Sequence, residues 1–346
     1  MNKIFFIILG TTFVALVILF AYFGTSNNTI KIGVIATLTE IGQYQGQQEV
    51  KGLELAVEEI NNSGGILGKQ VELIVEDSKA DPKEAALAIQ KLIEKDNINY
   101  IIGDSWTSTT VALVPIINKD EIILISPVAI LDSLSENDYF YRTIPKIEYF
   151  MEPLVNYTFF DLNVKTVGIL SQNTPYGKEH VNDFKLAFEK LGGKITEVEF
   201  FELKEKDLKT EILKIKETNP QAVLNLHATT PALGDLIKQA HELGFNPIWL
   251  CSFGAENKDL ITQYPEFSNG IIYPYSDDAN TKGDLFLSNS YDALMILAKA
   301  INNTGKDDPK LVKEKLDLSN YFDKNGDVKT EIIIKQIQNG EFVQIK

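Results

Sequence analysis

Residues 97–130 read NINYIIGDSWTSTTVALVPIINKDEIILISPVAI, and this stretch decides the fold. Its two short apolar runs, 100–102 and 122–125, are typical of parallel strands that helices cover on both faces. Between them, Val111, Val114 and Ile117 recur at helical spacing, which predicts a crossover helix. The stretch therefore predicts one strand–helix–strand unit of an α/β fold.

Small polar residues follow both predicted strands at the point where each strand ends. Residues 105–110 are rich in hydroxyl groups, and Ser126 follows the second strand. In an open parallel sheet, ligands bind outside the carboxyl ends of the strands, where helix N-termini converge. A carboxylate or another small polar head group would suit this edge. Capping of the next helix explains the same hydroxyl groups without a ligand, so both interpretations stay open.

The same alternation of strands and helices fills most of the chain, with one interruption. Strands are expected at 31–36 and 71–76, and helices at 48–61 and 82–95. The rhythm breaks at 141–152 and then restarts, with strands expected at 166–171, 194–201, 222–226, 248–251 and 270–273. Two α/β lobes of similar, doubly wound design are therefore expected.

An Asn-Gly pair at 325–326 predicts a hairpin turn near the C-terminus, with a strand at 331–338 after it. Asp323, Asn325 and Asp327 also resemble the start of a calcium loop. A calcium loop is disfavoured, because its glycine and its terminal glutamate would be misplaced.

Composition excludes several classes of function. The chain has 346 residues and a formal net charge of −15, and so acidic a protein is a poor partner for nucleic acid. Cys251 is the single cysteine and the three histidines lie far apart, so no disulfide, no metal site and no cofactor are expected. The sequence lacks dinucleotide, phosphate-loop and nucleophile-elbow motifs, so an enzyme is not expected.

The N-terminus carries an apolar segment. Residues 4–23 are an uninterrupted run of apolar and small residues, about the length that spans a bilayer. Residues 1–24 are therefore expected to form a transmembrane anchor that leaves the rest of the chain outside the cell membrane, after a linker at 25–29. A cleaved signal peptide, which would release a secreted or periplasmic protein, is the alternative.

Several motifs together resemble type I periplasmic solute-binding proteins, in particular the leucine/isoleucine/valine-binding group that delivers solutes to ABC importers. The segment 52–69 reads GLELAVEEINNSGGILGK and looks like part of the opening of that family. Further similar segments are Val75-Glu-Asp-Ser, Ile125-Ser-Pro, Pro175-Tyr-Gly, Asn289-Ser-Tyr-Asp-Ala and Phe322-Asp-Lys-Asn-Gly-Asp. The resemblance implies two lobes joined by three crossings, which close around a ligand. It places lobe 1 at 30–143 plus 276–318 and lobe 2 at 144–275 plus 319–346.

The resemblance also implies the site. Ser105, Trp106 and Thr107 stand where the family binds a ligand carboxylate, and Trp106 either walls the pocket or is a buried anchor. Tyr176 matches a tyrosine that stacks on the ligand. The other candidate ligand contacts are Gln45, Ser126, Val128, Ile130 and Thr229.

Two positions depart from the amino-acid-binding pattern. Ile130 stands where those proteins have a threonine, and Phe253 stands where they have the acid that pairs with the ligand's ammonium group. A buried ammonium group without a carboxylate is costly, so a neutral or acidic ligand with an apolar body is expected unless Asp104 or Glu256 supplies the charge. Phe253 would offer aromatic contact instead.

The sequence thus predicts a solute-binding protein of an ABC importer, with an amino-acid-like, amide or small carboxylate ligand and a transporter permease as partner. A sensory ligand-binding subunit with the same fold, signalling to a separate membrane protein, is the alternative. An altered relative that binds nothing also remains open.

Overall fold

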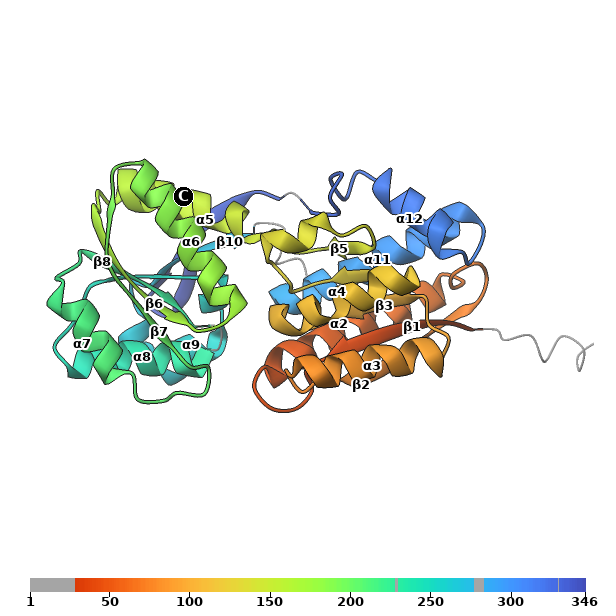
Figure 1. The fold of residues 1–346 in the computed structure, drawn as a ribbon, viewed down its shortest axis with the longest axis horizontal. Coiled ribbons are helices and arrows are strands. Elements are labelled where there is room, and N and C mark those ends of the chain that lie inside the picture. Colours follow the sequence, from red (N-terminus) through yellow and green to blue (C-terminus); the bar gives the residue numbers. More distant parts are fainter. Residues whose placement is uncertain (1–28, 228–229, 277–282, 329) are drawn as a thin grey trace, which may run out of the picture.

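The computed structural model describes residues 29–227, 230–276, 283–328 and 330–346. Figure 1 shows two lobes side by side, each built around its own sheet, with the C-terminus on the second lobe. The predicted α/β class with two lobes is confirmed. The predicted anchor at residues 1–24 lies outside the described residues. Within the described part of the chain, no helix combines the length and the apolar character needed to cross a membrane.

The first sheet is parallel throughout and has the order β2-β1-β3-β4-β5. Its central strands, β3 and β4, are buried at every position, which explains why they read as unbroken apolar runs. The strands are β1 (Thr29–Ala36), β2 (Gln70–Asp77), β3 (Tyr100–Gly103), β4 (Ile123–Ser126) and β5 (Phe140–Arg142).

Helices cover both faces of this sheet. On one face α3 and α4 pack against Ile35, Ile101 and Leu124, and on the other face α2, α11 and α12 pack against Ile32 and Val34. Helices α2 and α11 touch closely, because a side chain at Gly52 would lie 2.2 Å from the Leu287 carbonyl oxygen. The helices are α2 (Gln43–Asn62), α3 (Pro82–Glu94), α4 (Thr107–Asp120), α11 (Leu285–Thr304) and α12 (Pro309–Asp317), with a 3₁₀ turn η1 (Asp132–Glu136).

The second sheet has the order β12-β11-β10-β9-β8-β6-β7, parallel except for the last two strands of the chain. Its strands are β6 (Thr166–Gln172), β7 (Lys194–Phe201), β8 (Ala222–Leu226), β9 (Ile248–Cys251), β10 (Ile272–Ser276), β11 (Ile332–Gln338) and β12 (Glu341–Gln344). The helical segments are α5 (Ile147–Asn156), η2 (Tyr157–Asp161), α6 (Pro175–Lys190), α7 (Lys209–Glu217), α8 (Thr230–Glu242), η3 (Phe253–Ala255), α9 (Lys258–Gln263) and α10 (Pro265–Ser268). The expected strands of this lobe are therefore confirmed.

The chain passes between the two sheets three times: after β5, after β10 and after α12. The segment after α12 first stays with the first lobe. Phe322 packs against Tyr141 with ring centroids 5.1 Å apart, and Asp327 forms an isolated parallel bridge with Arg142. We therefore propose that the third passage begins after Asp327, rather than at residue 319.

The hairpin expected at Asn325-Gly326 is wrong. The segment Asp323–Asp327 is a closed turn that docks on β5, because the Arg142 N–H donates to the Gly326 carbonyl oxygen at 3.0 Å. The C-terminal hairpin instead joins β11 and β12 and turns at Asn339 and Gly340, both of which have positive φ. The C-terminal region contains two Asn-Gly pairs, at 325–326 and at 339–340. Only the second lies between two strands that pair with each other, so only the second forms a hairpin turn.

Candidate functional site: the edge between the lobes

The N-terminus of helix α4 has no side-chain cap. The helix begins at Thr107, directly after β3 and the loop that follows it, and its N-cap residue Trp106 makes no capping side-chain bond. The hydroxyl groups of Thr109 and Thr110 donate to the Trp106 carbonyl oxygen at 2.7 and 2.9 Å, so neither of them caps the helix. The first N–H groups of a helix have no intrahelical partner and attract an anion. The hydroxyl run therefore leaves this anion-binding position uncapped.

The Ser105 hydroxyl group faces the interior of the first lobe. It accepts from the Thr37 N–H at 2.9 Å and donates to the Glu49 carboxylate at 2.5 Å, and the residue is 2% exposed. Both of its bonds are internal. The neighbouring Thr107 is 4% exposed, and its hydroxyl group has no hydrogen-bond partner among the described residues. Of the two residues, Thr107 is the one whose hydroxyl group remains free for a ligand.

Two acids lie buried behind this loop. Burial raises the pKa of Asp104 to about 7, although hydrogen bonds from the Ser78 hydroxyl group and the Ser105 N–H oppose the shift. Burial also raises the pKa of Glu49 well above its ordinary value. Asp104 is completely buried, and its Oδ1 accepts from Ser78 and from the Ser105 N–H, while its Oδ2 has no hydrogen-bond partner among the described residues. Asp104 is thus a poor substitute for the missing ammonium partner.

Residues of both lobes line one small cavity of about 20 Å³. Gln45 and Phe253, both sequence candidates, lie on opposite sides of it, together with Tyr44, Gly254, Glu256, Asn257, Tyr275, Asp284, Leu285 and Phe286. Trp106 is held nearby, because its indole N–H donates to the Ile41 carbonyl oxygen at 3.0 Å. The turn before α2 passes so close that a side chain at Gly42 would meet the indole at 2.1 Å.

Phe253 is an aromatic anchor on the second lobe. Its ring stacks on Phe150 at a centroid distance of 4.9 Å, and the residue is 6% exposed. Tyr176 lies in the first turn of α6 and is close to Cys251 and Ser252, which precede Phe253. Burial raises the pKa of Tyr176 to about 12, which keeps the phenol neutral. The Tyr176 ring also lies 4.2 Å from the ring of buried His180, whose pKa burial lowers to about 4.

Glu256, the second candidate for pairing with an ammonium group, already has partners. Its carboxylate forms an ion pair with Lys335 and accepts a hydrogen bond from the Tyr273 hydroxyl group. The side chains of Glu256 and Lys335 are only 10% and 9% exposed. A ligand ammonium group would have to displace Lys335 from this acid, so Glu256 is an internal charge partner.

The segment after β4 is folded onto itself and onto its neighbours. The Ser126 hydroxyl group accepts from the Ala129 N–H at 2.9 Å, and Asn289 donates to the Pro127 carbonyl oxygen at 3.1 Å. Val128 is 8% exposed and Ile130 is completely buried. The predicted candidate Thr229 lies outside the described residues. The segment supplies backbone and apolar groups, with no hydroxyl group at the Ile130 position.

Three larger cavities are lined by no sequence candidate, so size does not identify the site. One of about 530 Å³ lies between α5 and α6, one of about 570 Å³ lies beside α11 and α12, and one of about 210 Å³ lies beside β5 and the turn Asp323–Asp327. Next to the first cavity, Asp132 of the first lobe meets Glu179 and Asp183 of the second, with carboxylate oxygens within 4.8 Å of one another.

Sequence reasoning missed several residues at this edge, and some of them carried a signal. Glu49 lies on the buried face of α2 with Gly46, Leu53 and Ala56, so helical spacing alone places an acid in the core. Tyr44 adjoins the candidate Gln45 and donates to Asp284 at 2.7 Å. Nothing in the sequence indicates that contact, since the two residues are 240 positions apart.

Comparison with known families adds a decisive match. The family model described as "Periplasmic binding protein" matches residues 29–295, which is most of the chain. The chain belongs to the periplasmic binding protein family. This family membership places the protein outside the cytoplasmic membrane and confirms the resemblance that the sequence motifs suggested.

Individual relatives of this periplasmic binding protein agree with the family match. A leucine-, isoleucine-, valine-, threonine- and alanine-binding protein of Pseudomonas aeruginosa is 25% identical over 339 residues, which cover 90% of each chain. A leucine-binding protein of Thermotoga maritima has a TM-score of 0.85 at 23% identity, covering 92% of this chain and 98% of the other. A solute-binding protein of an ABC transporter from Rhodopseudomonas palustris, solved with 3,4-dihydroxybenzoic acid, has a TM-score of 0.82 at 20% identity, covering 92% and 96%.

These relatives are named as binding proteins, in agreement with the expectation that the chain is not an enzyme. Their recorded ligands differ, since one name gives aliphatic amino acids and another an aromatic acid. The shared fold therefore does not fix the ligand, and the side chains at the edge between the lobes must decide it.

Proposed function

We propose that the protein is the extracytoplasmic solute-binding component of an ABC importer. In this proposal the cleft takes a small carboxylate with an apolar or aromatic body and without an ammonium group. The observation that carries the proposal is the stack of Phe253 on Phe150, at the position where amino-acid binders resembling this chain have an acid. Neither acid that might replace it is free, because Asp104 is buried in the first lobe and Glu256 is paired with Lys335.

The carboxylate end of the ligand would bind at the start of α4. There the uncapped helix N-terminus offers N–H groups and a partial positive charge, and the Thr107 hydroxyl group is free. Burial raises the pKa of Glu49 well above its ordinary value and that of Asp104 to about 7, so the buried acids behind the loop carry less negative charge than exposed acids would. A protonated carboxyl group does not repel the ligand.

The body of the ligand would lie between aromatic side chains of both lobes. Trp106 is fixed on the first lobe by its bond to Ile41, while on the second lobe Phe253 packs against Phe150 and Tyr176 packs against His180. Aromatic faces suit an apolar or aromatic body and contribute about 0.5–1.5 kcal/mol per ring pair beyond area burial. Closure of the lobes on the ligand, by motion at the three passages, would complete the site.

The N-terminal apolar run fits this role. An anchor at residues 1–24 would hold the binding protein at the outer face of the membrane, next to its permease, and a cleaved signal would release it. Both arrangements keep the two lobes outside the cytoplasm, so the proposed capture step is the same in each.

A thermal-shift screen tests the proposal, with separate panels of amino acids, amides, aliphatic acids and aromatic acids at millimolar concentration. A ligand that binds only the folded state stabilises it by about 4 kcal/mol at a thousandfold excess over Kd. We expect shifts from acids without an ammonium group, aromatic acids included. A strong shift from leucine or valine would overturn the proposed ligand class, and no shift from any panel would favour a sensory or non-binding protein.

A further inference from the structure

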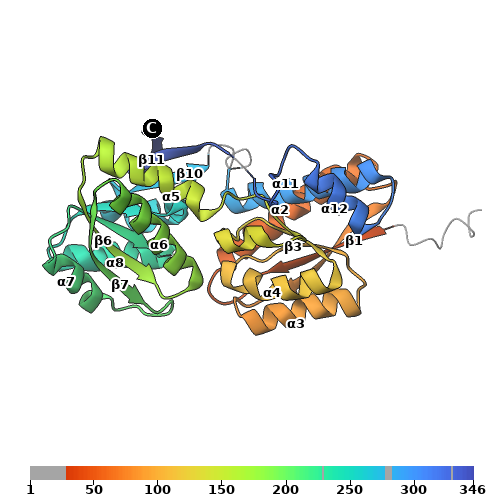
Figure 2. The ribbon, with the colours of Figure 1, turned by 45° about the horizontal axis from the view of Figure 1, so that its top comes forward.

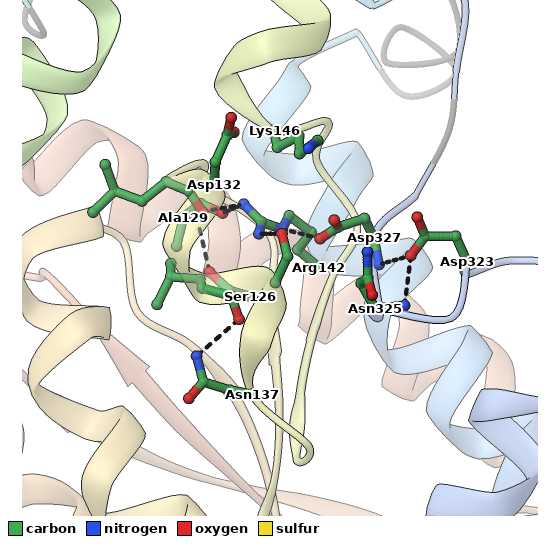
Figure 3. Close-up of polar contacts among 12 residues, drawn as sticks. Ser126, Ala129, Asp132, Asn137, Arg142, Lys146, Asp323, Asn325 and Asp327 are labelled. Atoms are coloured by element: carbon green, nitrogen blue, oxygen red, sulfur yellow. Dashed lines mark hydrogen bonds and ion pairs between the residues drawn. The ribbon is translucent and has the colours of Figure 1, made fainter. Parts of the chain in front are cut away.

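Arg142, the last residue of β5, is a completely buried arginine at the junction of the lobes. Its guanidinium group contacts four groups (Figure 3). One terminal nitrogen donates to the carbonyl oxygens of Leu131 at 2.9 Å and Ala129 at 3.3 Å. The other terminal nitrogen donates to the Ser135 hydroxyl group at 2.6 Å, and Nε lies 2.7 Å from the Asp327 carboxylate. A single side chain thus holds two segments that are far apart in the sequence.

The first of these segments, residues 129–135, is one of the parts of the first lobe that contact the second lobe. The Ile147 N–H at the start of α5 donates to the Ile130 carbonyl oxygen at 2.9 Å. The Asp132 N–H donates to the Glu179 carboxylate on α6 at 2.6 Å. Arg142 holds the same segment through its hydrogen bonds to Ala129, Leu131 and Ser135. Helices α5 and α6 of the second lobe therefore both contact a segment whose position is fixed by Arg142.

The second segment, the turn Asp323–Asp327, is the last part of the chain on the first lobe before the third passage. The Asp323 side chain accepts from the N–H groups of Asn325 at 2.8 Å and Asp327 at 3.1 Å, which fixes the turn. Gly326 has a φ of +77°, and a side chain there would lie 2.4 Å from the Phe140 carbonyl oxygen. The turn is thus shaped to dock on β5 and to present Asp327 to Arg142.

Burial makes this pair sensitive to the loss of either member. Desolvation lowers the pKa of Arg142, while Asp327 opposes that shift, as do the more distant Asp132 and Glu179. A buried charge that loses its partner is strongly unfavourable. The protein therefore has a physical reason to keep the first and third passages together at one point.

We propose that the Arg142–Asp327 pair is the fixed point about which the lobes close, and that Arg142 is a positioning residue for ligand capture. The pair clamps the first-lobe ends of two of the three passages. Through residues 129–135, Arg142 also sets the surface against which α5 and α6 rest. This proposal rests on the proposed function, because it assigns a role in the closure that ligand capture requires.

Interlobe distances measured by spin labelling test the proposal without any ligand. Labels are attached to cysteines introduced as Gln90→Cys on α3 and Glu189→Cys on α6, two exposed positions. The natural Cys251 is completely buried and burial raises the pKa of its thiol, so it stays unlabelled. The test variants are Arg142→Lys, which keeps the charge but loses the forked contacts, and Asp327→Asn, which keeps the shape but loses the charge.

Tyr141→Phe is the matched control, since it removes one hydrogen bond from the neighbouring residue, to Asp317 on α12, without touching either passage. We expect the interlobe distance distribution to become at least twice as wide in both test variants and to stay unchanged in the control. Equal broadening in Tyr141→Phe, or wild-type width in both test variants, overturns the proposal. If Arg142→Lys does not fold, Asp327→Asn decides alone. Failure to find a ligand would leave this distance measurement unaffected, so the two proposals fail separately.

Discussion

The Ser105 hydroxyl group donates a hydrogen bond to the Glu49 carboxylate, and both residues are buried in the first lobe. The two residues come from different elements, since Glu49 lies on α2 and Ser105 follows β3. In the loop that is proposed to bind the ligand, Ser105 thus carries an internal bond, while the Thr107 hydroxyl group has no hydrogen-bond partner among the described residues. Stability and ligand affinity should therefore respond to different hydroxyl groups of the same loop.

Replacing Ser105 with alanine should destabilise the protein. The substitution leaves the Glu49 carboxyl group and the Thr37 N–H without their partner, and a buried polar group left unpaired costs about 1–3 kcal/mol. Urea unfolding measures the loss. A free energy of unfolding equal to that of the wild type would show that the bond contributes nothing.

Replacing Thr107 with valine should weaken ligand binding and leave stability nearly unchanged. Valine keeps the shape of threonine and removes the hydroxyl group, and one hydrogen bond to a charged ligand contributes about 1.5–3 kcal/mol, roughly a 10- to 150-fold change in Kd. Titration calorimetry with the strongest acid from the thermal-shift screen provides the measurement. Unchanged affinity would remove Thr107 from the site.

The stability that Asp104 contributes should fall as the pH rises from 5 to 8, while buried His180 and His227, whose pKa values burial lowers to about 4, change stability in the opposite direction. Burial raises the pKa of Asp104 from 3.8 to about 7, so the folded protein holds this proton more tightly than the unfolded chain does. The resulting stabilisation is complete below about pH 4 and is lost as the pH rises through about 7, at up to roughly 1.4 kcal/mol per pH unit.

Urea unfolding at pH 5 and pH 8 measures this loss. Carboxyl groups whose pKa is lowered, such as Asp77, are already ionised at pH 5 and add little to it. Asp104→Asn removes only the Asp104 contribution, so the stability of the wild type relative to this variant should fall between pH 5 and pH 8. The same pH dependence in both proteins would contradict the raised pKa of Asp104.

Replacing Phe253 with leucine should change selectivity. Leucine removes the aromatic face that Phe253 would offer to an aromatic ligand, a contact worth about 0.5–1.5 kcal/mol beyond the change in buried area. Affinity for aromatic acids should fall roughly tenfold, while affinity for aliphatic acids should change little. The measured quantity is the ratio of the two Kd values, because a general loss of folding would affect both classes equally.

Breaking the Glu256–Lys335 pair should cost stability and leave selectivity unchanged. Lys335→Met strands a nearly buried carboxylate, for which about 3–5 kcal/mol is expected. The double variant with Glu256→Gln should recover much of that loss. If Glu256→Gln alone abolished binding of every panel ligand, Glu256 would be a ligand contact after all.

The sequence predicts most of the fold, because strands buried on both faces and helices with one apolar face have distinct patterns. Strands β3 and β4 and helix α4 were expected almost where they lie. Strand β5 was missed, because Phe140–Arg142 is short and ends in an arginine that no apolar pattern would place in a core. Its burial depends on Asp327, which is 185 residues away, and sequence spacing does not report such a contact.

The candidate site was predicted less completely, and the reason is orientation. The sequence brought Gln45 and Phe253 to one edge, and the structure places both on the same cavity. It could not tell that the Ser105 hydroxyl group turns inward, since the Thr37 N–H and Glu49 that hold it come from other elements. In the same way, the sequence could not tell that Glu256 is already paired with a cation, because Lys335 comes from a distant element.

The two halves of the first lobe are made at different times. One face of its sheet, with Ile32 and Val34, is covered partly by α11 and α12, which begin at Leu285 and Pro309. During synthesis, most of the second lobe must therefore leave the ribosome before the core of the first lobe can be completed. Until then, the N-terminal part of the first lobe exposes apolar surface, and nascent chains in this condition aggregate or recruit chaperones. Truncation before residue 285 should yield an insoluble product, although every strand of the first sheet is present.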